Sequence, residues 1–260
     1  MSLSLFNRNS IKIVMIYLVL FSTIPMFGQT TPDNSDFLVA ASGLGLAVGI
    51  ELFAKDHFMP DQPRFSKPNS MDAEIRKQLY WGKQKQEIAR IWSDRLIYGV
   101  SFSSLAWGPG FSSNPELSAL INMEVFALNS IVTNIIKVGF ARERPYHHYE
   151  TRPARGAVDF ASFFSGHSSV AFSQAVSNAI ILSEDYPHHS VAIWSSLLSL
   201  ASATAYFRVA GDMHYFSDVV VGAGVGIMIA WFITDYELDR FNKDSQPGVN
   251  FRLNLKIPLG

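Results

Sequence analysis

The sequence predicts an all-α protein, a helical bundle of about six core helices with a functional site at one rim. Three observations support this prediction. Six apolar stretches follow one another along the 260 residues, of which 48% are hydrophobic. The stretches lack the period-two alternation of half-buried strands, and their content of Ala, Leu, Met and Ile outweighs a purely β-branched composition. No repeat or low-complexity linker separates them, so we expect one bundle with its core at residues 96–235.

The first 28 residues match an export signal. They carry Arg8 and Lys12 but no acidic residue, and an apolar run over residues 13–21 follows. The helix-breaking Pro25 and the small Gly28 then suit a signal peptidase site. We expect cleavage after Gly28, with an uncleaved membrane anchor as the alternative. Either reading places the protein in the cell envelope.

Residues 29–95 combine one apolar helix with a polar surface region. The apolar, Gly-rich stretch covers residues 37–54 and is interrupted by Glu51. Prolines at 60, 63 and 68 mark the polar part that follows. Within it, Ser70 before Met71-Asp72-Ala73-Glu74 predicts the start of a short helix.

Five further apolar stretches are expected to be the helices of the bundle. They cover residues 96–111, 117–136, 168–183, 191–207 and 219–234. At 16 to 20 residues each, they lie at or below the minimum length for crossing a bilayer, and polar residues such as Asn122, Glu124 and Asn178 interrupt them. We therefore expect an exported bundle in the periplasm or on the membrane, with an integral membrane protein as the close alternative.

The last segment breaks the helical pattern. From Val249 to Ile257 hydrophobic and polar residues alternate, which is typical of an amphipathic strand. A single strand is not stable alone. We therefore expect residues 236–260 to form a C-terminal tail whose strand-like end lies against the bundle.

Composition excludes several kinds of chemistry and of partner. The 21 basic and 22 acidic residues give a net charge of −1 without a long basic run, so we expect no nucleic-acid partner. The absence of cysteine excludes disulfides, thiolate metal sites and cysteine nucleophiles. The pairs His147-His148 and His188-His189 could suggest a metal site. Adjacent histidines point apart on a regular element, so we interpret them as solvated loop residues and expect no metal.

Two cations close the stretch at residues 117–136. Lys137 and Arg144 are seven residues apart, which on a helix places them two turns apart on about the same face. Pro145 disfavours helical geometry at Arg144, so this second cation should lie where the helix ends and turn toward a ligand. Taken alone, the pair is better explained as a basic helix end favoured by the macrodipole.

Ser165-Gly166-His167 lies where a loop enters the stretch at residues 168–183. The unpaired N–H groups and the positive dipole end of a helix N-terminus favour an anion such as phosphate. Gly166 lets the backbone come close, and His167 can donate a proton to a leaving group. The alternative, which this segment supports equally, is ordinary helix capping by Ser165.

Arg208, His214 and Asp218 lie between the last two apolar stretches. On a helix, a spacing of four lets the Asp218 carboxylate receive the imidazole N–H of His214, which leaves the other ring nitrogen as a free nucleophile. A structural His–Asp pair at a helix start is the alternative. All three segments fall at ends of apolar helices, so a bundle can bring them to one rim. Three such coincidences are improbable as unrelated structural features.

In these segments the sequence resembles the phosphatidic acid phosphatase type 2 / vanadium haloperoxidase superfamily. The family signature is Lys-x6-Arg-Pro, Pro-Ser-Gly-His and Ser-Arg-x5-His-x3-Asp, and the resemblance covers roughly residues 90–235. Phe164 stands where the family usually has proline, and Phe207 where it usually has serine. Neither position supplies a main catalytic group.

The resemblance implies a role for each residue of the three segments. Five residues would bind phosphate: Lys137, Arg144, Ser165, Gly166 and Arg208. His214 would attack phosphorus, Asp218 would orient His214, and His167 would protonate the leaving oxygen. Such a reaction needs no metal cofactor, because three fixed cations neutralise the charge of the transferring phosphoryl group.

These features predict a metal-independent phosphatase that hydrolyses a phosphomonoester or pyrophosphate through a phosphohistidine intermediate. The substrate is expected to be a phosphorylated small molecule or a lipid met at the membrane, and vanadate is expected to inhibit. In one alternative, a vanadium-dependent haloperoxidase, vanadate would be the cofactor; the short chain without an extra domain favours the phosphatase. A non-catalytic envelope bundle is the other alternative, and the full set of two histidines, one aspartate and three cations argues against it.

Overall fold

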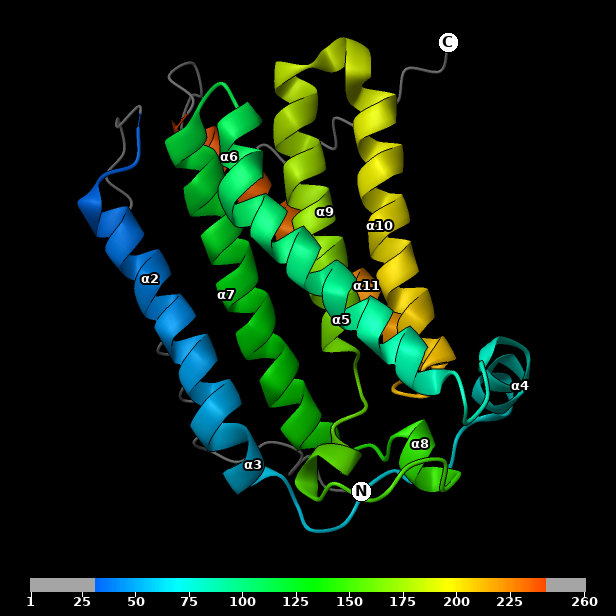
Figure 1. Ribbon diagram of the computed structural model, residues 1–260. Helices are drawn as coiled ribbons and strands as arrows, with labels where there is room; N and C mark the ends of the chain where they lie inside the picture. Colours follow the sequence, from blue (N-terminus) through cyan, green and yellow to red (C-terminus); the bar gives the residue numbers. More distant parts are fainter. Residues whose placement is uncertain (1–30, 242–260) are drawn as a thin grey trace.

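Six long helices run alternately in opposite directions in the computed structural model, which describes residues 31–241 (Figure 1). They are α2 (Asn34–Gly49), α5 (Gln86–Phe102), α7 (Pro115–Phe140), α9 (Gly166–Asp185), α10 (Ser190–Ala210) and α11 (Phe216–Phe241). The prediction of an all-α bundle with about six core helices is confirmed for this part of the chain. The predicted leader at residues 1–28 and the strand-like end of the tail lie outside the described residues.

Shorter elements gather at the two ends of the bundle. The short α-helices are α3 (Lys55–Phe58), α4 (Ser70–Leu79), α6 (Gly108–Phe111) and α8 (Pro145–His148). Two π-helical turns, Ile50–Ala54 and Ser103–Trp107, extend α2 and α5, and two 3-10 turns cover Ala157–Phe160 and Pro187–His189. The helix expected near residue 70 is α4, although its N-cap is Asn69, whose side chain accepts the N–H of Asp72 at 2.7 Å.

Helix α5 begins ten residues before the apolar stretch that predicted it. Its first half is amphipathic, with Gln86, Ala89, Ser93 and Ile97 buried at spacings of three and four residues. The polar residues between them gave this segment the composition of a surface region. The structure therefore places part of the expected surface region inside the bundle, and this part includes Asp94.

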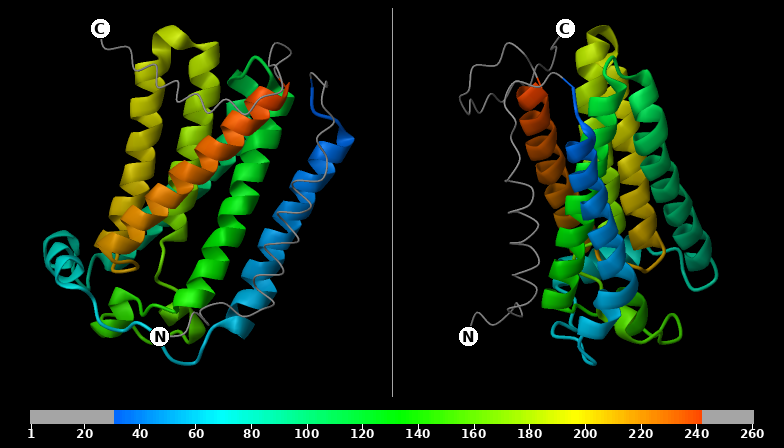
Figure 2. Two further views of the ribbon diagram at one scale, coloured as in Figure 1. Left: turned by 180° about the vertical axis from the view of Figure 1, so that it is seen from behind. Right: turned by 90° about the vertical axis from the view of Figure 1, so that its left-hand side faces the viewer.

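Helix α9 lies at the centre of the bundle and packs against α5, α7, α10 and α11. Seen from behind, α11 runs diagonally across the bundle (Figure 2). Two glycines allow its close approach, because a Cβ on Gly222 would lie 2.6 Å from the carbonyl oxygen of Ser165, and one on Gly226 would lie 2.2 Å from that of Ser169. This packing brings the start of α9 beside Asp218, whose carbonyl oxygen accepts the N–H of Ser165 at 3.0 Å.

Polar side chains of the apolar helices α7 and α9 form hydrogen bonds with one another. Asn122 accepts hydrogen bonds from Ser177 at 2.6 Å and from Asn178 at 3.0 Å, and Asn129 donates to Ser173 at 3.1 Å. These groups are buried in protein. Asn122 and Asn178 therefore do not argue against membrane insertion, as their sequence positions suggested, because polar side chains that face a bundle interior are tolerated there.

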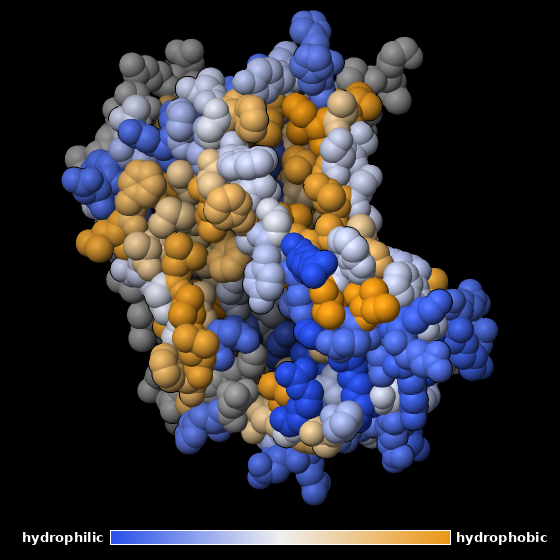
Figure 3. All heavy atoms as spheres, viewed as in Figure 1, coloured by the Kyte–Doolittle hydropathy of each residue, from blue (hydrophilic) through white to orange (hydrophobic). Residues whose placement is uncertain are grey.

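Four of the described helices are long and apolar enough to cross a membrane: Asn34–Phe53, Pro115–Phe140, Pro187–Ala210 and Phe216–Phe241. Large apolar side chains stand exposed along them, including Leu38, Val191, Leu200, Met228 and Phe232. In Figure 3 apolar residues cover much of the length of the bundle, whereas the end that bears α4 and α8 is largely hydrophilic. The chain thus belongs to the membrane or cell envelope, as predicted. The exposed apolar surface favours the integral alternative over a peripheral bundle.

Candidate active site

The three segments singled out in the sequence meet at one end of the bundle, where α7 and α10 end and α9 and α11 begin (Figure 1). Six of their eight candidate residues are at most 9% exposed: Lys137, Arg144, Ser165, Arg208, His214 and Asp218. Gly166 and His167 are partly exposed. The structure therefore brings the candidate residues together in a mostly buried site, whose two partly exposed residues lie at the start of α9.

Helix α7 ends earlier than the spacing of its two cations suggested. Ala141 adopts the left-handed conformation, with a φ of 44°, and ends the helix after Phe140. Lys137 is therefore in the last helical turn, whereas Arg144 lies in extended chain with φ −76° and ψ 150°. The expectation that both cations share one helix face is wrong. The extended geometry before Pro145 is the one that the proline predicted.

Helix α9 begins against the side chain of Lys137. A Cβ on Gly166 would lie 3.5 Å from Nζ of Lys137 and 3.1 Å from Cγ2 of Thr133. Ser165 caps this helix, since its Oγ accepts the N–H of Ser168 at 3.3 Å. The first N–H groups of a helix have no intrahelical acceptor. Capping by Ser165 is thus present, and the helix start still offers donors and a positive dipole end beside an ammonium group.

The imidazole of His214 is held from both of its nitrogens. Nδ1 lies 2.8 Å from the carbonyl oxygen of Ser162, which can only accept, so Nδ1 carries the hydrogen and Nε2 of the neutral ring keeps its lone pair. Nε2 lies 3.3 Å from Nη1 of Arg144. Burial lowers the pKa of His214 well below its ordinary value, and the charges of Arg144 and Arg208 lower it further. The neutral, nucleophilic form therefore prevails at neutral pH.

Asp218 does not receive the imidazole N–H that the four-residue spacing suggested. Its nearest oxygen is 3.7 Å from Nδ1 of His214, beyond hydrogen-bond distance. The reason is that His214 lies before the first residue of α11, so the two residues do not share a helix. Asp218 Oδ2 instead accepts the Ser162 hydroxyl at 2.6 Å and the backbone N–H of Tyr215 at 2.9 Å. Asp218 thus fixes Ser162, and the carbonyl of Ser162 holds His214.

Arg142 is a neighbour of the site that sequence reasoning missed. Its guanidinium donates to Asp218 Oδ1 at 2.5 Å and to Asp72 of α4 at 2.8 Å. Asp72 also accepts the backbone N–H of Ser217 at 2.8 Å. These contacts connect α4 to the start of α11. In the sequence Arg142 is only one of the residues between Lys137 and Arg144, and no spacing rule distinguishes it.

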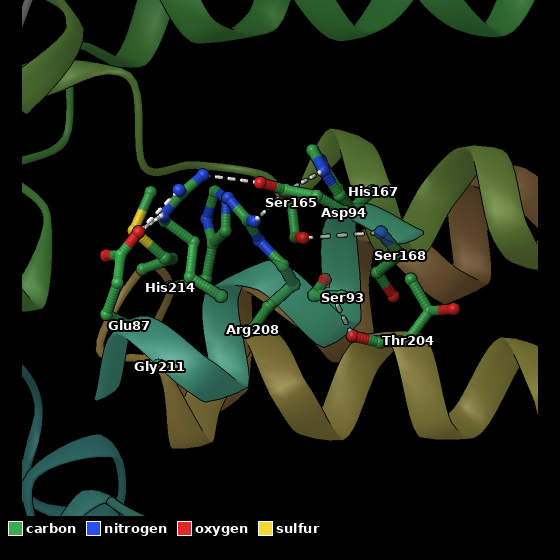
Figure 4. A network of polar contacts seen from close by, with 12 residues as sticks. Glu87, Ser93, Asp94, Ser165, His167, Ser168, Thr204, Arg208, Gly211 and His214 are labelled. Atoms are coloured by element: carbon green, nitrogen blue, oxygen red, sulfur yellow. Dashed lines mark hydrogen bonds and ion pairs between the residues drawn. The ribbon is translucent and has the colours of Figure 1, made fainter. Parts of the chain in front are cut away.

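A second missed residue, Asp94 of α5, contacts two of the candidate residues directly (Figure 4). Its Oδ1 lies 3.0 Å from Nε2 of His167 and 3.0 Å from Nη1 of Arg208. Its Oδ2 accepts from Nη1 of Arg90, one turn earlier in α5. The four-residue spacing of Arg90 and Asp94 is the one sequence signal, because it predicts an ion pair on one helix. It does not predict which residues of other helices this pair contacts.

Arg208 is the most deeply buried of the three cations, with 3% of its surface exposed. Its Nε is buried without a hydrogen-bond partner among the residues that the structure describes. Buried N–H donors are rarely left unpaired, and a charged donor strongly favours an oxyanion. This nitrogen can therefore donate to an oxyanion that enters the site.

The histidine pairs do not form a metal centre in the described part of the chain. His147 and His148 both direct Nδ1 to Glu143, at 2.5 and 3.2 Å, so they are paired rather than fully solvated. His188 and His189 are exposed at the opposite end of the bundle. Within residues 31–241 no group of three or more His, Asp or Glu side chains is placed to hold a metal ion.

The two departures from the family signature lie in aromatic contacts. Phe164 is buried, and its ring packs edge-on against Phe163 at 6.2 Å between centroids. Phe207 packs edge-on against Trp81 at 5.5 Å, in the connection between α4 and α5. The Phe207 ring therefore packs on the connection between α4 and α5.

A known protein family matches the part of the chain that contains the three sequence segments. The family model of the PAP2 superfamily matches residues 118–241, which contain all eight candidate residues. A crystal structure described as the first transmembrane PAP2 type phosphatidylglycerolphosphate phosphatase, from Bacillus subtilis, also matches. It is 16% identical, and the match covers 91% of this chain and 100% of that one with a TM-score of 0.41.

Proposed function

Since this chain belongs to the PAP2 superfamily and is a phosphoric ester hydrolase, we propose that it hydrolyses a lipid-linked phosphomonoester or pyrophosphate through a phosphohistidine at His214. One observation carries this proposal. The Nδ1 hydrogen of His214 is held by a carbonyl at 2.8 Å, and Nε2 faces the Arg144 guanidinium at 3.3 Å. A lone pair directed at a cationic pocket is the arrangement that attack on an anionic phosphoryl group requires.

Binding of the phosphoryl group would use charges that the fold already holds in place. Lys137, Arg144 and Arg208 would neutralise its oxygens, and Nε of Arg208 supplies an N–H donor that lacks a partner within residues 31–241. The first N–H groups of α9, at Gly166 and His167, add donors at the positive end of a helix dipole. Because these groups belong to the chain, we propose that no metal ion is required.

The first chemical step forms one bond and breaks one. Nε2 of His214 donates its lone pair to phosphorus while the bond from phosphorus to the leaving oxygen breaks. His167 gives that oxygen a proton, which releases an alcohol or a phosphate. The phosphorylated ring becomes positive and is stabilised by the Ser162 carbonyl at Nδ1 and by Asp218 at 3.7 Å.

The second step restores the enzyme. Water attacks phosphorus in line with the P–N bond, and His167, now neutral, takes a proton from this water. The P–N bond breaks, its electron pair returns to Nε2 of His214, and inorganic phosphate leaves. Burial and then the charge of Arg208 lower the pKa of His167 to about 3, which the negative charge of a phosphate group would oppose.

A lipid substrate is the class that fits the placement of the site. The site lies at one end of helices that are long and apolar enough to cross a membrane. A lipid phosphate sits at the corresponding depth, at the surface of a bilayer, with its tails beside the apolar sides of the helices. We therefore propose that the head group reaches the site while the tails stay in the bilayer.

The test compares purified wild-type protein with His214→Gln in detergent or bilayers. Three substrates are assayed: a phosphatidic acid, a lipid pyrophosphate and nitrophenyl phosphate. We expect the wild type to prefer a lipid substrate and to yield a base-stable, acid-labile phosphoprotein after rapid quenching with ³²P-labelled substrate. A folded His214→Gln protein with near wild-type turnover, or no release of phosphate from any substrate, would overturn the proposal.

A further inference from the structure

Asp94 is not part of the three sequence segments, yet one of its oxygens joins two of them. Oδ1 lies 3.0 Å both from Nε2 of His167, on α9, and from Nη1 of Arg208, on α10. In the proposed reaction these two groups have different tasks, since His167 moves a proton and Arg208 binds the phosphate. A single carboxylate oxygen therefore fixes the distance between the proton donor and a phosphate ligand.

The contact to His167 determines which ring nitrogen can act as the acid. An ionised carboxylate only accepts, so Nε2 of His167 carries the hydrogen that points to Asp94. The proton that is given to a leaving oxygen must then sit on Nδ1. The carboxylate also stabilises the doubly protonated ring that exists just before this transfer.

The contact to Arg208 leaves the remaining donors of this guanidinium for substrate. Nη1 is used by Asp94, whereas Nε is buried without a partner among the described residues. The planar guanidinium fork has fixed geometry, so holding Nη1 also sets the direction of Nε. Asp94 is itself held, because its second oxygen accepts from Arg90 in the same helix. Side-chain exposures of 25% for Asp94 and 4% for Arg208 show that this array is mostly enclosed by protein.

We propose that Asp94 is a positioning residue that presents His167 as the proton donor and aims Arg208 at the phosphate; this inference rests on the phosphatase function proposed above. Two other roles would fit the same contacts. Asp94 could be a purely structural ion pair, or its carboxylate could occupy the position of a phosphate oxygen and slow substrate binding. Each role predicts a different pattern of kinetics.

Several charged groups face His167, and they set the expected pH dependence. Asp94 raises its pKa, whereas burial, Arg208 of α10 and Lys137 of α7 lower it. Removing the negative charge of Asp94 therefore lowers the pKa of His167 further. Turnover needs the protonated ring, so the alkaline limb of the kcat profile should move to lower pH in Asp94→Asn.

The experiment uses the full-length protein with Asp94→Asn and Asp94→Glu, and Glu87→Gln as the matched control. Glu87 lies on the same helix and also pairs with Arg90, but neither His167 nor Arg208 is among its partners. kcat and KM are measured on an alkyl phosphate, which has a poor leaving group, and on nitrophenyl phosphate, which has a good one.

We expect Asp94→Asn to lose roughly 10–100-fold in kcat on the alkyl phosphate, clearly less on nitrophenyl phosphate, and to show the displaced alkaline limb. Asp94→Glu should recover part of the loss, and Glu87→Gln should stay within about twofold of the wild type. Equal losses on both substrates with an unmoved pH profile would show a structural role and overturn the proposal. Faster turnover or a lower KM in Asp94→Asn would show a blocking role and overturn it as well.

Two controls keep this result separate from the proposed function. Thermal midpoints of all variants identify a variant that fails to fold. If Asp94→Asn fails to fold, Asp94→Glu alone decides between the outcomes by its leaving-group dependence, because its retained charge leaves the pH profile uninformative. Failure of the phosphohistidine proposal would show in His214→Gln, through retained turnover. The Asp94 variants leave His214 intact, so their kinetics test only the positioning role.

Discussion

Nδ1 of His214 donates its hydrogen to the carbonyl oxygen of Ser162 at 2.8 Å. The imidazole is therefore oriented by backbone, and the carboxylate of Asp218 acts one contact further away, through the Ser162 hydroxyl at 2.6 Å. In a direct His–Asp pair the carboxylate itself would orient the nucleophile, whereas here it fixes the residue that does so. It predicts that loss of the carboxylate is less damaging than loss of the ring.

His214→Gln should abolish turnover, because no other side chain supplies the attacking nitrogen in the proposed reaction. Asp218→Asn should keep a measurable rate, lower by roughly 10–100-fold, since the Ser162 carbonyl still holds Nδ1 while the charge that stabilises the phosphorylated ring is lost. Steady-state kcat and the yield of labelled phosphoprotein measure both effects. His188→Gln, an exposed histidine at the far end of the bundle, is the control and should behave as the wild type. Equal losses in the His214 and Asp218 variants would contradict this division of roles.

The pH dependence should reflect the lowered pKa of His214. Attack needs the unprotonated ring, so activity is lost as pH falls through this pKa. Burial and the neighbouring arginines place it below the ordinary value of 6.5. The acidic limb of kcat/KM should therefore lie below pH 6.5, once the second ionisation of the substrate phosphate, at about 6, is taken into account. A limb at or above the ordinary histidine value in the corrected profile would argue against a neutral His214 in the resting enzyme.

The close packing of α11 on α9 should be sensitive at one glycine and tolerant at a neighbouring one. A Cβ on Gly226 would lie 2.2 Å from a backbone oxygen of Ser169, so Gly226→Ala should cost about 1–3 kcal/mol in the free energy of unfolding. A Cβ on Gly224 would meet nothing within 4 Å, and Gly224→Ala should gain up to about 0.5–1 kcal/mol from helix propensity. Thermal midpoints in detergent measure the difference. Similar midpoints for the two variants would mean that the helices are not in this close contact.

The sequence predicted which polar residues lie near one another where these residues stand at the ends of apolar stretches. Lys137, Ser165-Gly166-His167 and His214 stand at the ends of apolar stretches, so a bundle had to place them near one another. Asp94 and Arg142 could not be found in this way. Their partners are 73 and 76 residues away in the chain, at His167 and Asp218, and only packing brings them together.

Local geometry limited the sequence analysis in a different way. The spacing of Lys137 and Arg144 suggested one helix face, but a left-handed Ala141 ends α7 between them. Nothing in the type of residue 141 announces this conformation, since alanine is a strong helix former. The polar first half of α5 was likewise assigned to the surface, because its narrow buried face has ordinary polar neighbours.

Vanadate should inhibit competitively, and EDTA should have no effect. Vanadate is a tetrahedral oxyanion that can become five-coordinate, and the proposed pocket of three cations, with the buried Nε donor of Arg208, suits it. Initial rates at several vanadate concentrations should show a raised KM and an unchanged kcat. Chelator sensitivity that a divalent ion reverses would reveal a metal requirement that the proposed mechanism does not include.

Insertion into a membrane should place the two ends of the bundle on opposite sides of the bilayer. Lys83, in the connection between α4 and α5, and His188, in the turn between α9 and α10, are both exposed. These two connections lie at opposite ends of the bundle, and the one between α4 and α5 is at the catalytic end (Figure 1). The chain contains no cysteine, so Lys83→Cys and His188→Cys each create a single thiol. In sealed membrane vesicles an impermeant maleimide should label one variant and not the other, and detergent should make both reactive, because a bilayer around the apolar helices blocks passage of a charged reagent. Equal labelling of both variants in sealed vesicles, together with release of the protein by carbonate, would show a bundle that lies on one side of the membrane.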